Sequence, residues 1–128
     1  MATTTELWQF GAAELARMVR TRRVSSREVV EAHLRRIDQV NPRLNAVPVV
    51  LGDEALAASM AADARAAAGD VLPPFHGVPF TVKANIDVLG SPTTEGLRAK
   101  SGIDCANGGG RREPAAGDRI GEEDQFLL

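Results

Sequence analysis

Cysteine and aromatic residues are scarce in this 128-residue sequence. Cys105 is the only cysteine, so no disulfide can form within the chain, and nothing in the composition indicates an oxidising compartment. Tyrosine is absent, and aromatic residues make up only 4% of the chain. The apolar fraction of 44% is rich in alanine, which buries little surface per residue. The sequence therefore predicts a single domain with a small hydrophobic core.

The sequence also lacks a strong charge of either sign and any long apolar run. Its 15 basic and 17 acidic side chains give a net charge of −2, so we expect no nucleic-acid partner and no binding to an anionic membrane. No stretch approaches the length of a membrane span. Residues 1–10 lack the basic start and apolar run of a signal peptide. The default expectation is a cytoplasmic protein.

Clusters of metal-ligating residues are missing as well. His33 has no second histidine, carboxylate pair or cysteine at ligand spacing beside it, so we interpret it as a surface or boundary residue of a helix. We expect neither a metal nor a cofactor. Four arginines are interpreted as a solvated helix face, because acidic residues are interspersed among them: Arg22, Arg23, Arg35 and Arg36.

Two helices are predicted in the first third of the chain. Apolar residues at helical spacing predict a short amphipathic helix over residues 12–22. Ser25 followed by Glu28 forms a capping box, which marks the start of a second helix over residues 26–40. We expect that helix to stop before Asn41-Pro42, because proline disfavours helical geometry in the preceding residue.

A third helix is predicted after an extended connection. Residues 45–51 are rich in β-forming residues, but Pro48 lacks a backbone donor, so the run is either an edge strand or a linker. Asp53 is expected to cap a helix over residues 54–68, which Gly69 should end. This helix is dense in alanine and needs a partner surface to remain folded.

Residues 74–87 are the only segment that indicates chemistry. Proline and glycine turns bracket a short apolar run, Val78–Val82, and Lys83 follows it directly. The pattern predicts a buried strand that ends in a cation. The lysine has two interpretations. Its stem could pack on apolar surface with the ammonium in water, or the amine could be desolvated, which lowers the pKa of a lysine and lets it act as a base.

The order of motifs around Lys83 resembles the lysine-bearing segment of the amidase signature family, which comprises serine hydrolases that cleave the C–N bond of amides. The motifs that carry the resemblance are His76-Gly77-Val78-Pro79, Val82-Lys83, Asn85-Ile86-Asp87 and Gly90-Ser91-Pro92-Thr93-Thr94-Glu95-Gly96. Upstream segments resemble the same family, including Ser25-Ser26-Arg27-Glu28-Val29-Val30 and Asn41-Pro42-Arg43-Leu44-Asn45-Ala46. The resemblance covers about residues 14–97, and several spaced motifs make it more specific than any single one.

This resemblance implies that Lys83 is the catalytic base of a Ser-Ser-Lys triad. The family's two serines lie in a downstream glycine- and serine-rich loop, and these 128 residues contain no such loop. Ser91 and Ser101 are not expected to be nucleophiles, and the run of glycines at 108–110 has no serine. The residue after the lysine is commonly acidic in the family, and here it is Ala84. The implied chemistry therefore has its base but lacks its nucleophile.

The family's α/β/α layered fold gives the expected architecture. We expect the α/β class over residues 1–97, with the first helices and strands of that fold and an incomplete sheet that contains Phe80–Lys83. Residues 98–128 show no periodicity and are expected to be a disordered tail. A frameshift or early end within a longer amidase gene is one hypothesis for this tail, and a natural tail is the other. Cys105 is interpreted as an unactivated thiol and His76 as a residue that shapes the turn.

Two functions follow from the sequence. The first is a truncated amide hydrolase that is inactive alone and whose substrate in the full-length family is a small-molecule amide. The alternative is a non-catalytic module whose amphipathic helices dock on an unknown protein partner. The sequence also predicts a marginal, partly helical chain, because a short sheet would be left with open edges.

Overall fold

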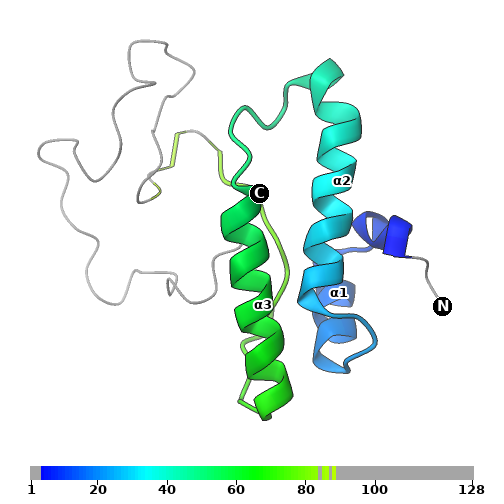
Figure 1. Cartoon of the computed structure of the whole chain (residues 1–128), viewed down its shortest axis with the longest axis vertical. Helices are drawn as coiled ribbons and strands as arrows, with labels where there is room; N and C mark the ends of the chain where they lie inside the picture. The colour runs from blue at the N-terminus through cyan, green and yellow to red at the C-terminus, as the bar shows by residue number, and fades with distance from the viewer. Residues whose placement is uncertain (1–3, 84, 87, 89–128) are drawn as a thin grey trace, which may run out of the picture. The chain divides into compact units, whose positions relative to one another are not determined.

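The computed structural model describes residues 4–83, 85, 86 and 88. The described residues fall into two compact units, with residues 4–81 in the first and residues 82, 83, 85, 86 and 88 in the second. The described elements are a 3-10 helix and three α-helices, all in the first unit (Figure 1). None of these helices is both long and apolar enough to cross a bilayer.

The chain enters through η1 (Thr4–Gln9) and α1 (Ala12–Arg20). α1 is amphipathic, since its buried residues recur on one face: Leu15, Ala16, Met18 and Val19. It ends slightly earlier than the prediction of residues 12–22, because Arg22 takes a left-handed φ of 55° and breaks the helical path. The Thr21 hydroxyl donates to the carbonyl of Arg17 at 2.9 Å, and the amide of Thr21 donates to the same carbonyl at 3.0 Å.

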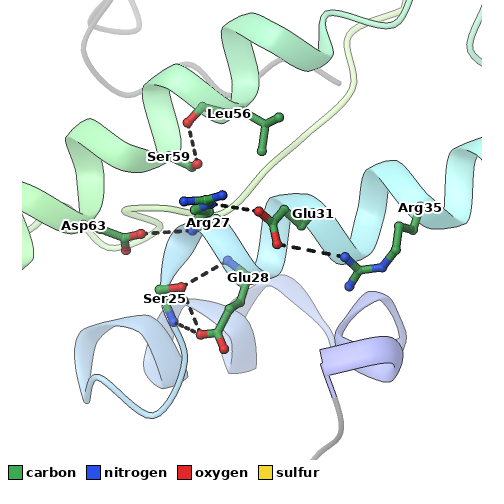
Figure 2. Close-up of polar contacts among 8 residues, drawn as sticks. All are labelled: Ser25, Arg27, Glu28, Glu31, Arg35, Leu56, Ser59 and Asp63. Atoms are coloured by element: carbon green, nitrogen blue, oxygen red, sulfur yellow. Dashed lines mark hydrogen bonds and ion pairs between the residues drawn. The ribbon is translucent and has the colours of Figure 1, made fainter.

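α2 (Ser26–Leu44) begins with the predicted capping box. The Ser25 Oγ accepts from the amide of Glu28 at 3.1 Å, and the Glu28 carboxylate accepts from the amide of Ser25 at 2.8 Å (Figure 2). The predicted stop at residue 40 is wrong, because Pro42 lies inside the last turn. A proline there removes only one helical hydrogen bond, and Asn45 ends the helix in the left-handed conformation three residues later.

α3 (Gly52–Ala68) ends at Gly69 as predicted, with a left-handed φ of 82°. The predicted cap at its start is wrong. The helix begins one residue before Asp53, with Leu51 as the N-cap and no side-chain cap, because the amide of Ala55 already bonds to the carbonyl of Leu51 at 3.0 Å. The connection from α2 contains no strand, so the linker alternative for residues 45–51 is the correct one.

Two small apolar clusters hold the helices together. The first joins η1, α1 and α2 to the segment after α3 and contains Leu7, Leu15, Ala16, Met18, Val19, Val29, Ala32 and Val78. The second lies between α2 and α3, which run side by side (Figure 1), and its buried members are Val30, Ala55 and Ala62. Two of these three buried residues are alanines, and the larger side chains that pack against them, Leu34, Ile37 and Leu56, are only partly buried. The fully buried part of this interface therefore contributes little apolar area per residue.

The predicted strand after α3 is not formed. Within residues 70–83 the only β-type residue is Phe80, and it makes an isolated bridge. The amides of His76 and Val78 bond instead to the carbonyls of Pro73 and Phe75, both at 3.2 Å, which closes two successive turns. The described residues are therefore helical with irregular connections, and the strands expected for the α/β class are not among them. The predicted tail, residues 98–128, lies outside the described residues.

Candidate active-site segment

The segment that leads to Lys83 is a tight turn seated on the helices. It runs from Pro73 to Val78 and is centred on Gly77, whose φ of 77° lies in the region that favours glycine. Val78 belongs to the first apolar cluster, and His76, Gly77 and Pro79 are also buried. The first part of the predicted motif is thus a packed structural unit rather than a surface loop.

Ser26, the first residue of α2, contacts this turn directly. Its hydroxyl donates to the carbonyl of Gly77 at 2.8 Å, and the serine itself is fully buried. The two residues are so close that a Cβ placed on Gly77 would lie 3.0 Å from both Cβ and Oγ of Ser26 and 3.1 Å from Cγ1 of Val19. Only glycine fits this approach without a shift of its neighbours.

Two further side chains bind carbonyls at the start of the turn and on α3. The Arg20 guanidinium, at the end of α1, donates to the carbonyls of Pro73 and Pro74 at 3.3 and 3.0 Å. The His76 ring is 4% exposed, and its Nε2 lies 3.0 Å from the carbonyl of Ala62 on α3. This placement agrees with the interpretation of His76 as a residue that shapes the turn. Each of the three helices therefore holds the turn at a different point.

Asp63 of α3 fixes the start of α2 beneath the turn. Its Oδ1 accepts from the amide of Ser26 at 2.7 Å, and its Oδ2 accepts from the amide of Arg27 at 3.1 Å (Figure 2). Figure 2 draws the contact with Arg27 only. Both amides belong to the first turn of α2, where helical partners are missing and where the helix dipole favours a negative charge. One carboxylate thus caps α2 from a neighbouring helix.

Lys83 lies at the beginning of the second unit, and its side chain is exposed. Its carbonyl accepts from the amide of Ile86 at 2.9 Å, which forms a turn directly after the lysine. In the part of the chain that the structure describes, no carboxylate pairs with its ammonium. The described residues therefore do not supply the burial on which a desolvated lysine depends.

The remaining candidates from the sequence either lie in surroundings that do not indicate a functional site or fall outside the described residues. His33 is half-buried, and its Nδ1 lies 2.8 Å from the carbonyl of Val29 one turn earlier. No group of three potential metal ligands occurs within residues 4–83, 85, 86 and 88. Ala84, Ser91, Ser101 and Cys105 lie outside the described residues.

The arginines interpreted as a solvated face are more engaged than predicted. Arg22 donates to the carbonyl of Ala66 on α3 at 2.6 Å. The guanidinium of Arg36 lies 4.3 Å from the centre of the Trp8 ring, a cation–π contact that ties η1 to α2. Arg35 follows the prediction more closely, because it only faces Glu31 at 4.0 Å on the exposed side of α2 (Figure 2).

Sequence reasoning missed Ser26 and Asp63 as residues that hold the motif. Asp63 offered one signal, since it is the single acidic residue in the alanine-rich second half of α3. A lone carboxylate among small apolar residues is expected to have a specific partner when it is not fully exposed. Its partners lie 37 and 36 residues earlier in the chain, and no local pattern reveals them.

Comparison with known proteins places this segment in a family. The family model for amidases matches residues 28–104, which include Asp63, Gly77 and Lys83. The chain belongs to the amidase signature family. The predicted resemblance, based on the motifs around Lys83, is thereby confirmed.

Relatives from other organisms match this part of the amidase sequence. An indoleacetamide hydrolase of Bradyrhizobium diazoefficiens is 48% identical over 93 residues, which cover 73% of this chain and 18% of the relative. A component of the glutamyl-tRNA(Gln) amidotransferase of Acidothermus cellulolyticus is 46% identical over 91 residues, with coverage of 71% and 18%. The chain thus spans about a fifth of the length of these relatives.

Solved structures agree with this assignment. One chain of a vestigial protein complex, described in connection with the evolutionary origins of an s-triazine catabolic enzyme, has a TM-score of 0.76 at 28% identity. The similarity covers 93% of the present chain and 25% of that one. An inhibitor-bound form of the complex has a chain with a TM-score of 0.71 at 30% identity, with coverage of 74% and 21%.

Proposed function

We propose that this amidase segment supplies the lysine base of an amide-hydrolysing site, and that Lys83 is that base. The observation that carries the proposal is the place of Lys83 in the sequence, five residues after a turn that three helices hold, within the segment matched by the amidase family. The side chains of Arg20, Ser26 and His76 hold this turn by hydrogen bonds to α1, α2 and α3, and catalytic sites are typically built next to such rigid segments.

The proposed reaction follows the Ser-Ser-Lys logic. The neutral Nζ of Lys83 accepts the proton of one serine hydroxyl, and that serine takes the proton of a second serine as its oxygen attacks the amide carbonyl carbon. The C–N bond breaks, the amine or ammonia leaves with a proton, and the acyl group remains on the serine until water releases it as a carboxylate. These 128 residues contain no glycine- and serine-rich loop, so other residues would have to provide both serines and bury Lys83.

The proposed substrate class is a small carboxamide. The relatives with matching segments include an indoleacetamide hydrolase and a component of a glutamyl-tRNA(Gln) amidotransferase. The proposal of a small carboxamide follows the name of the first of these relatives, which is 48% identical over the matched segment. A cytoplasmic location fits the single cysteine and belongs to the same proposal.

A complementation experiment tests this function. The probe is the indoleacetamide hydrolase of Bradyrhizobium diazoefficiens lacking the 93 residues that match this chain, co-expressed with the present chain. We expect hydrolysis of indoleacetamide only when both parts are present. Lys83→Ala should lower the rate by about 10²-fold or more, since general base catalysis typically contributes 10²–10⁴-fold. Arg43→Ala, which removes an exposed cation of α2, is the matched control and should retain the rate.

One outcome would contradict the proposal, and another would contradict only the expected inactivity of the chain alone. Equal rates for Lys83→Ala and the wild-type chain in the complemented enzyme would exclude Lys83 as the base. Hydrolysis by the chain alone that disappears in Lys83→Ala would overturn its expected inactivity. Activity of the chain alone that survives the same substitution indicates a contaminating hydrolase.

The second candidate function is a non-catalytic interaction module. Large apolar side chains that remain exposed around the turn favour it, because Val71 is 95% exposed and Phe75 is 59% exposed. In this alternative the chain binds a protein partner and never takes part in turnover. If the wild-type chain restores indoleacetamide hydrolysis and the Lys83→Ala chain does not, the amidase function is supported and the module is excluded.

A further inference from the structure

We propose that Ser26 is a positioning residue, and that with Asp63 it forms a latch that fixes the turn six residues before Lys83. The latch consists of two linked contacts. The amide of Ser26 is held by Asp63 of α3, and the hydroxyl of Ser26 holds the carbonyl of Gly77. A single buried residue therefore joins α3, α2 and the turn.

The burial of these atoms gives the latch its strength. Ser26 is 0% exposed and Gly77 is buried, so water cannot replace the hydroxyl as the partner of the Gly77 carbonyl. A buried carbonyl left without a donor lowers the stability of the fold by more than the net contribution of an exposed hydrogen bond. The left-handed φ of Gly77 and its 3.0 Å approach to Ser26 leave the turn little room to shift.

The latch acts on the turn rather than on the helices as such. α2 retains its capping box through Ser25 and Glu28, which does not involve the hydroxyl of Ser26. Removal of this hydroxyl should therefore open the turn while α2 remains formed. Two amides report the state of the turn, because those of His76 and Val78 donate to the carbonyls of Pro73 and Phe75 only when it is closed.

The chain offers a matched control for Ser26. Ser59 is also 0% exposed and also donates one short hydrogen bond, from its Oγ to the carbonyl of Leu56 at 2.7 Å (Figure 2). That bond stays within α3 and does not reach the turn. Ser26→Ala and Ser59→Ala thus remove the same chemical group from equally buried sites, and only the first breaks the latch.

Amide hydrogen exchange on the 128-residue chain, followed by NMR, tests the proposal. In Ser26→Ala we expect the amides of His76 and Val78 to exchange about tenfold faster or more, while the amides in the middle of α2 change by less than about twofold. Ser59→Ala should leave both reporters unchanged. Unchanged reporters in Ser26→Ala, or equal acceleration of the reporters and of α2, would overturn the positioning role.

A measurement on the wild-type chain covers the case in which Ser26→Ala does not fold. The close approach predicts nuclear Overhauser contacts from the α protons of Gly77 to the β protons of Ser26 and to the γ methyl group of Val19. Their presence supports the latch, and their absence from an otherwise assigned spectrum would overturn it without any variant.

The importance of the latch for catalysis rests on the proposed function. In the complemented indoleacetamide hydrolase, Ser26→Ala should lower kcat about tenfold or more relative to Ser59→Ala, because a displaced base loses catalytic geometry. Failure of the wild-type chain to complement counts against the proposed function, while the exchange experiment still decides on the latch. Equal kcat values for the two serine variants, in an active complemented enzyme, would overturn the catalytic importance of Ser26.

Discussion

At the residue scale, two glycines with similar backbone angles have different surroundings. Gly69 has a φ of 82° and nothing within 4 Å of the position of a Cβ, whereas Gly77 has a φ of 77° and meets Ser26 and Val19 at 3.0–3.1 Å. An alanine at either position carries the penalty of the left-handed conformation, about 1 kcal/mol. Only at Gly77 does overpacking add about 1–3 kcal/mol. We therefore expect Gly77→Ala to destabilise the chain by about 2–4 kcal/mol and Gly69→Ala by about 1 kcal/mol.

Urea titration followed by circular dichroism at 222 nm compares the urea concentrations at which the wild type and the two variants lose half of their helical signal. Sucrose in the buffer strengthens the folded state of all three proteins and provides a folded baseline for the comparison. Equal losses for the two alanine variants would show that the turn does not press against Ser26 and Val19 in solution. A larger loss at Gly69 would contradict the packing of the turn altogether.

At the element scale, the start of α2 depends on a carboxylate from α3. Asp63 accepts from two amides of α2, whereas Asp53 is exposed in the first turn of α3 and caps no helix. We expect Asp63→Ala to lower the free energy of unfolding by about 2 kcal/mol, because it removes a cap and leaves two amides without partners. Asp53→Ala should lower it by no more than about 0.5 kcal/mol, through the helix dipole alone. The same titration compares them, and similar effects would mean that Asp63 does not cap α2.

The contrast between these two aspartates shows how far the sequence predicts the elements. The Ser25–Glu28 capping box was predicted correctly because its partners lie three residues apart and the pattern is local. Asp53 has the residue type and place of a cap, but the helix begins before it. The partners of Asp63 lie on another helix, and the spacing of residues in the sequence does not indicate them. The helices and the boundaries set by local signals, such as the start of α2 and the end of α3 at Gly69, were therefore predictable, while the other boundaries and the contacts between helices were not.

The candidate site shows the same division between local and long-range information. Lys83 was predicted from the order of motifs around it, and the matched amidase family confirms the resemblance on which that prediction rests. The expected strand before Lys83 depended on pairing with a neighbour, and within the described residues the amides of His76 and Val78 bond within their own turns instead. Strand formation requires a partner strand, which a local apolar run cannot guarantee.

At the scale of the whole molecule, the size of the core determines how the chain unfolds. The fully buried large apolar side chains among the described residues are only Leu7, Leu15, Val29 and Val30. No described aromatic residue is fully buried, since Phe10 packs against the first cluster while half-buried and Phe75 is 59% exposed. The buried face of α3 consists of Ala55, Ser59 and Ala62. So small a core offsets conformational entropy only weakly. We therefore expect a marginal chain that loses helical signal gradually at low urea concentrations.

Two substitutions connect that expectation to the observed core. Leu15 is 2% exposed and Met60 is 57% exposed, so Leu15→Ala removes core contacts and Met60→Ala does not. Loss of a buried leucine typically lowers the free energy of unfolding by 2–5 kcal/mol, about as much as a marginal chain possesses. Leu15→Ala should then be largely unfolded without urea, while Met60→Ala should follow the wild-type curve. A steep wild-type transition, with a slope of about 1–3 kcal/mol/M, would instead show that these few side chains suffice for a cooperative domain.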